Sequence, residues 1–95
     1  MNNHDLAWAA STSKEERFSA LLDTMTRVAR AYAEDADRAE HLAEGYDLDR
    51  EDENLSEGER RSCAFQAGKY YEQATMLRRR SAELLDYVEL LATCK

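Results

Sequence analysis

Three side chains in the first half of the chain have types and spacing that can bind a metal. Asp37, His41 and Glu44 are four and three residues apart, so a helix would place them on one face. A di-iron helical bundle needs a Glu-x-x-His motif on two helices and further glutamates, and the chain has no such motif. We therefore expect a surface histidine among carboxylates, with no bound metal and no cofactor.

The segment that follows begins like a calcium-binding loop, with carboxylates at Asp47, Asp49 and Glu51. An EF-hand loop requires glycine at its sixth position and a bidentate glutamate at its twelfth. The chain has Asp52 and Gly58 at these two positions, which excludes an EF-hand.

The two cysteines, Cys63 and Cys94, have no partner for redox or nucleophilic chemistry. On one helix their 31-residue separation corresponds to about 46 Å, whereas a disulfide needs Cα atoms within about 7 Å. The sequence also lacks a glycine-rich phosphate loop, a serine elbow and a Cys/His pair. We expect no catalytic residues and predict that the chain is not an enzyme.

Negative charge is concentrated in the middle of the chain. Residues 34–59 contain 12 acidic and two basic residues, whereas the remainder contains eight acidic and 11 basic residues, which together give the net charge of −7. Such a block repels nucleic acid and attracts a basic protein surface. The alternative is a solvated segment without a partner. The candidate partner-binding residues are Glu34, Asp37, Glu40, Glu44, Asp47, Asp49, Glu51, Asp52 and Glu53.

Positive charge does not favour nucleic-acid binding either. Arg78, Arg79 and Arg80 are consecutive, so on a helix they point in different directions. Direct contact with DNA or RNA is not expected.

Two stretches of the chain have the same periodic spacing of apolar residues, and this spacing indicates which secondary-structure elements position the residues above. Each keeps a spacing near 3.5 residues over about four heptads, which is typical of two helices that pack along their length. The first stretch contains Phe18, Leu21, Met25, Val28, Tyr32, Ala39 and Leu42, and the second contains Cys63, Ala67, Tyr70, Ala74, Leu77, Ser81, Leu84, Val88 and Leu91. The sequence predicts an all-α fold, an antiparallel hairpin of two long helices.

Capping signals mark the helix boundaries. Ser13 precedes Glu16 by three residues, and Ser56 precedes Glu59 by three, which is the pattern of a capping box. Gly45 is suited to end the first helix in a left-handed conformation. We predict a hairpin domain over residues 13–95, with helices at about 14–44 and 57–93 and an acidic loop at about 45–56. Residues 1–12 would form an N-terminal arm or a short helix.

The two ends of the predicted hairpin differ in side-chain size. Alanine, glycine and tyrosine dominate near the acidic loop, whereas leucines dominate at the other end, where two helices alone cannot cover them. We expect dimerisation to complete a bundle. Alternatively, the arm carrying Trp8 covers a monomer. The candidate oligomer or apolar-partner contacts are Trp8, Leu22, Leu84, Leu85, Val88 and Leu91.

Two polar residues interrupt the apolar positions, Asp35 and Ser81. A polar residue in a helical seam often fixes register or partner choice. For Asp35, we favour the alternative that its side chain tilts to solvent or meets Lys69 or Tyr70.

Composition and charge suggest a function class. The chain has no apolar run of 18 residues and no basic segment at its start, so we expect a cytoplasmic protein without a membrane span. We predict a non-enzymatic module that engages a basic, nucleic-acid-binding surface of another protein, in the manner of DNA-mimicking inhibitors from phages and mobile elements. A second hypothesis is a helical adaptor or secretion-type chaperone that binds an amphipathic helix through the leucine-rich end.

Overall fold

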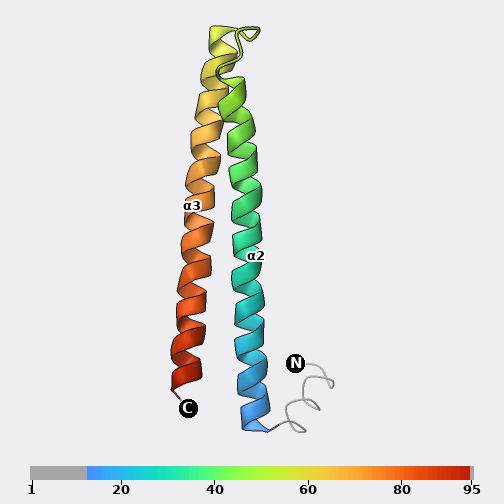
Figure 1. Cartoon of the computed structure of the whole chain (residues 1–95), viewed down its shortest axis with the longest axis vertical. Helices are drawn as coiled ribbons and strands as arrows, with labels where there is room; N and C mark the ends of the chain where they lie inside the picture. Colours follow the sequence, from blue (N-terminus) through green and yellow to red (C-terminus); the bar gives the residue numbers. More distant parts are fainter. Residues whose placement is uncertain (1–12, 95) are drawn as a thin grey trace, which may run out of the picture.

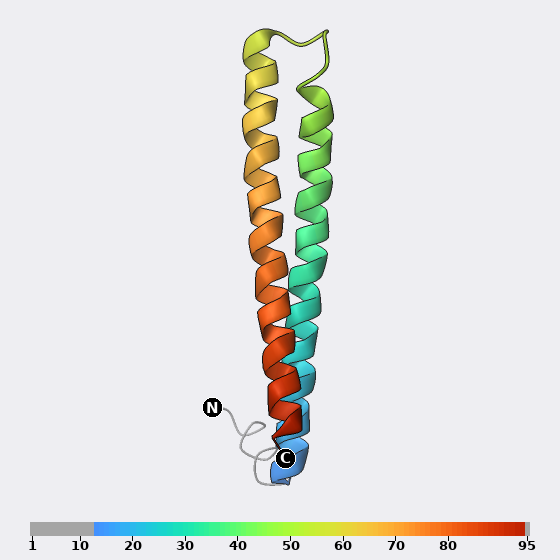
Figure 2. The same ribbon diagram turned by 60° about the vertical axis from the view of Figure 1, so that its left-hand side comes forward.

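The computed structural model describes residues 13–94 as two long antiparallel helices joined by a short loop. Helix α2 runs over Lys14–Asp49 and helix α3 over Glu57–Thr93, side by side along their length in both views (Figures 1 and 2). We call the end with the connection the loop end, and the end where α2 begins and α3 ends the open end. The prediction of an all-α antiparallel hairpin is confirmed. The predicted arm, residues 1–12, lies outside the described residues.

Both helices begin with a serine cap, as the sequence predicts. The Ser13 hydroxyl accepts a hydrogen bond from the Glu16 backbone N–H over 3.1 Å. At α3 the capping box is complete, because Ser56 accepts from the Glu59 N–H and the Glu59 carboxylate accepts from the Ser56 N–H. These caps satisfy backbone donors that a helix start leaves without partners.

The predicted end of the first helix is wrong. Helix α2 continues through Gly45 to Asp49, and none of the described glycines has a positive φ. The extra turn has packing of its own, because the Tyr46 ring stacks on the Tyr70 ring with centroids 5.8 Å apart. Such contacts offset the roughly 1 kcal/mol by which glycine is less favourable than alanine in a helix. The connecting loop therefore shortens to residues 50–56, and Asp47 and Asp49 lie on the helix.

The buried side chains between the helices are all small. They are Ala29, Ala36, Ala39, Ala43, Ala67, Ala74 and Ser81, and no large side chain among the described residues is fully buried. The Ser81 hydroxyl donates to the Ala29 carbonyl over 2.7 Å, and Ala36 shares a cluster with Ala74. Small residues let the two backbones approach, but they bury little apolar surface. The hairpin therefore has a narrow alanine seam in place of a large apolar core.

Asp35 is exposed and forms an ion pair with Arg38 on the same helix. Its side chain faces solvent, which agrees with the interpretation of Asp35 that the sequence favoured.

In the described part of the chain, neither helix combines the length with the apolar content that a membrane crossing requires.

Candidate protein-binding surfaces

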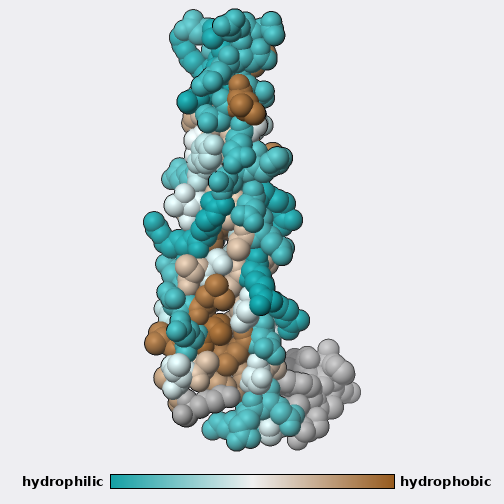
Figure 3. Space-filling view, viewed as in Figure 1, coloured by the Kyte–Doolittle hydropathy of each residue, from teal (hydrophilic) through white to brown (hydrophobic). Residues whose placement is uncertain are grey.

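Acidic side chains form a stripe along one side of α2. Asp37, Glu44 and Glu51 recur every seven residues, with Glu40 and Asp47 between them, so the stripe follows the helix toward the loop. Its helical part, from Asp37 to Asp47, spans about 15 Å at 1.5 Å per residue, and Glu51 continues it into the loop. We refer to the nine predicted carboxylates, Glu34, Asp37, Glu40, Glu44, Asp47, Asp49, Glu51, Asp52 and Glu53, as the acidic end. In Figure 3 hydrophilic side chains dominate the loop end of the visible face, and hydrophobic ones gather near the open end.

A shallow hollow of about 350 Å³ lies on this stripe. Its lining combines the three carboxylates of Glu44, Asp47 and Glu51 with the side chains of Leu48 and Tyr71. Partial desolvation raises the pKa of the Tyr71 phenol, and the negative charges of Asp47 and Glu44 raise it further. The hollow therefore joins negative charge to an aromatic ring, and both attract a cationic side chain.

Arginines of the hairpin neutralise part of the acidic end. Arg78 reaches across from α3 to Asp37, over 3.2 Å, and to Glu40. The hydrogen bond with Glu40 is the main cause that raises the pKa of the Arg78 guanidinium. Arg50 pairs with Asp47 over 2.9 Å. Asp52 accepts a hydrogen bond from the Asn54 backbone.

The remaining carboxylates of the acidic end have no ion-pair partner among residues 13–94. All are exposed, and they are Glu34, Glu44, Asp49, Glu51 and Glu53. These five are the residues of the predicted set that stay available to a partner.

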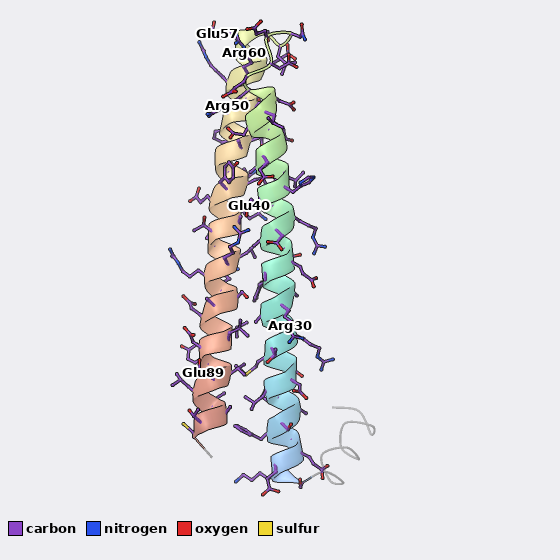
Figure 4. All side chains as sticks on the ribbon, in the orientation of Figure 1. Arg30, Glu40, Arg50, Glu57, Arg60 and Glu89 are labelled. Carbon is purple, nitrogen blue, oxygen red and sulfur yellow. The ribbon has the colours of Figure 1, made fainter. Side chains whose placement is uncertain are left out.

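A small group of arginines lies at the loop end. Arg50, Arg60 and Arg61 line a hollow of about 390 Å³ together with Glu51 and Glu57, and Figure 4 shows Arg50, Glu57 and Arg60 gathered there, with Glu40 farther along the hairpin. Arg61 pairs with Glu57 over 2.7 Å. The Nε atom of Arg60 is buried without a hydrogen-bond partner among the described residues. Nearby carboxylates balance this positive group, so it does not make an anion site.

The side chains that could bind a metal ion are not grouped into a binding site. Among residues 13–94, no three His, Cys, Asp or Glu side chains form a group that could hold a metal ion, and this includes Asp37, His41 and Glu44. Cys63 and Cys94 are both free thiols, one half-buried and one exposed.

One face of the hairpin carries large apolar side chains from both helices. Other large apolar side chains are exposed elsewhere, namely Leu48, Phe65, Tyr71, Met76, Leu85 and Leu90. On α2, Leu21, Met25, Val28 and Tyr32 are spaced by four, three and four residues, which places them on one side. Tyr32 lines a hollow with Leu84 and Tyr87 of α3, so large side chains of both helices meet on this side, and the charged side chains of Arg80 and Glu83 border the same hollow. The Tyr46–Tyr70 stack continues this face toward the loop. We define the apolar face as Leu21, Met25, Val28, Tyr32, Leu42, Tyr46, Tyr70, Leu77, Leu84, Tyr87 and Leu91.

The residues predicted to contact a second copy or an apolar partner lie in different parts of the hairpin. Leu84 and Leu91 belong to the apolar face and are half-buried. Leu22 and Val88 continue the alanine seam toward the open end at seven-residue steps from Ala29 and Ser81. Leu85 is exposed and lies seven residues from Arg78, so it faces the side that carries the cross-helix ion pairs. Trp8 lies outside the described residues.

Two residues that the structure places at these surfaces were not among the candidate contact residues predicted from the sequence. Tyr71 borders the acidic hollow and Tyr87 borders the hollow on the apolar face. Both positions flank the seam of α3. Tyr71 is seven residues from Arg78, so the sequence alone places both on one side of α3. Only the pairing of the two helices shows which carboxylates of α2 lie next to that side.

Comparisons with protein-family models, curated proteins and solved structures give no match to this chain.

Proposed function

We propose that the chain is a non-enzymatic protein-binding module whose acidic end engages a basic surface of another protein. The hollow formed by Glu44, Asp47, Glu51 and Tyr71 is the observation that carries this proposal. The carboxylates of Glu44 and Glu51, which have no ion-pair partner among residues 13–94, can accept hydrogen bonds from a guanidinium or ammonium group, and the Tyr71 ring can pack against the alkyl part of the same side chain.

Charge along the hairpin supports the same proposal. The loop half, residues 34–76, contains 13 acidic and five basic residues, whereas the open half, residues 13–33 and 77–94, contains six acidic and seven basic residues. A field of this kind steers a basic partner to one end of the molecule. A protein that binds nucleic acid has such a basic surface, so the module would act as an inhibitor or regulator by occupying it.

The test is affinity capture from the native host at low and at high salt. We compare the wild-type chain with a Glu44→Gln/Glu51→Gln variant and with a control, Glu83→Gln/Glu89→Gln, which removes two exposed charges from the open half. We expect the wild type and the control to retain the same partner at low salt and to lose it at high salt. The Glu44→Gln/Glu51→Gln variant should bind about tenfold more weakly, a loss of roughly 1.4 kcal/mol.

Salt-independent capture would contradict the proposal, since screening weakens attraction between exposed charges. Equal loss of binding in the control would also contradict it, because the effect would then follow net charge and not the acidic end.

The half-exposed apolar face favours a second candidate function. An adaptor or chaperone would lay the amphipathic helix of a client along this face. Leu84→Asp would then abolish client binding while salt had little effect. Capture that survives Leu84→Asp would exclude this function.

We also propose that the module is a homodimer. Large apolar side chains from both helices that are left half-exposed on one face are typical of a helical hairpin that completes a bundle with a second one.

A further inference from the structure

We infer that a second copy of the chain covers the apolar face, and that the loop ends of the two copies point in opposite directions. This inference rests on the homodimer proposed above and adds the surface and the orientation. It is independent of whether the acidic end binds a partner.

The two faces of the hairpin differ in what they offer to another molecule. Arg78 and its carboxylate partners, Asp37 and Glu40, occupy the middle of one face. On the apolar face, Leu21, Val28, Leu42 and Tyr87 are between 41% and 60% exposed although no large side chain is fully buried among the described residues. The exposed Asp35 interrupts the row on α2, because it lies seven residues from both Val28 and Leu42, so the large apolar side chains are concentrated toward the open end. Isolated exposed apolar residues are common, but a group contributed by two helices marks a contact surface. The apolar face is therefore the side that a partner covers.

The side of the hairpin that carries the apolar face is large enough for a stable dimer interface. Helix α2 has 36 residues and is therefore about 54 Å long. Two helices packed about 10 Å apart present a face roughly 20 Å wide, or on the order of 1,000 Å². A specific protein interface buries about 800 Å² on each partner.

A helix formed by residues 1–12 would cover only part of this face. Twelve residues span about 18 Å as a helix, which is about a third of the length of α2. One such helix would also lie over only part of the width of two helices. A second hairpin matches both dimensions.

Charge determines the orientation of the second copy. The loop half has a net charge of −8 and the open half a net charge of +1. If both loop ends lay at the same end of the bundle, the two loop halves, each with a net charge of −8, would be neighbours. If the loop ends lay at opposite ends, each loop half would be next to an open half with a net charge of +1. Because like charges in close contact repel, the second arrangement is favoured. The two acidic ends then lie at opposite ends of the bundle.

The first experiment measures the mass of the chain by sedimentation equilibrium. The wild type should sediment at twice its mass of 10.9 kDa. Val28→Glu/Tyr87→Glu places charges at two exposed positions of the apolar face and should sediment as a monomer. The control, Phe65→Glu/Met76→Glu, changes two exposed apolar residues outside this face and should remain a dimer.

The second experiment measures the orientation without changing the apolar face. Spin labels at Glu53→Cys, in a Cys63→Ser/Cys94→Ser background, report the distance between the two loops. Opposite loop ends predict a separation of about 50 Å, close to the length of a helix, whereas loop ends on the same side predict about 20 Å or less.

Each result decides a different claim. A monomeric wild type would overturn the proposal that a second copy covers the face. A dimer that persists in Val28→Glu/Tyr87→Glu would overturn the choice of face. A short distance between the labels would overturn the orientation. None of these results would decide whether the acidic end binds a basic surface.

Discussion

Residues of one type have different roles in this hairpin, and only some of the carboxylates are available to a partner. Glu59 accepts a hydrogen bond in the α3 capping box, and Asp35 and Glu57 pair with arginines on their own helices. The sequence predicted where negative charge is concentrated, but not which carboxylates arginines neutralise. The Arg78 contacts join residues about 40 positions apart, so they depend on the pairing of the helices.

The Tyr71 phenol provides a probe of the acidic hollow. Partial desolvation and the charges of Asp47, Glu44 and Glu40 raise its pKa, because each disfavours the phenolate. The folded state therefore favours the neutral phenol. Its contribution to stability is present below the pKa of the unfolded chain and is lost as the pH rises through the folded pKa. Glu44→Gln should lower the Tyr71 pKa, as measured by NMR of labelled tyrosine rings.

The matched control for this titration is Glu89→Gln, an exposed carboxylate near the open end of α3. It should leave the Tyr71 pKa unchanged. If Glu44→Gln has no more effect than Glu89→Gln, Glu44 does not act on the hollow in the way the structure indicates.

At the scale of elements, the sequence predicted both helices because capping signals and apolar spacing agree. It failed at Gly45, where local preference favoured a helix end and the Tyr46–Tyr70 contact extends the helix instead. That contact joins two helices, so local sequence rules do not contain it. The alanine positions were visible in the sequence, but their role as the whole buried seam follows only from the pairing.

A larger side chain in the seam tests how closely the helices pack. Ala36 is fully buried opposite α3, so Ala36→Leu must push the helices apart or adopt a strained rotamer. We expect its free energy of unfolding, measured in urea at fixed protein concentration, to fall by about 1–3 kcal/mol. The control Ala31→Leu is on an exposed position of the same helix and should change it by less than about 0.5 kcal/mol. Equal effects of both substitutions would contradict a close-packed seam.

For the whole molecule, the structure gives two surfaces with different chemistry. The acidic end carries the negative charge, and the apolar face carries large side chains that no part of the described chain fully buries. The sequence predicted the contrast between the two ends of the hairpin. It did not predict that Leu85 and Leu84 lie on different sides, because this depends on the register of α3 against α2.

A fold that a second copy completes should have a stability that depends on concentration. The most direct measurement is the thermal unfolding midpoint of the wild-type chain over a hundredfold range of protein concentration. Because association stabilises the folded state by mass action, the midpoint should rise steadily with concentration. A midpoint that stays constant over this range would show that one hairpin is stable alone, and would contradict the claim that its apolar face is covered by a second copy.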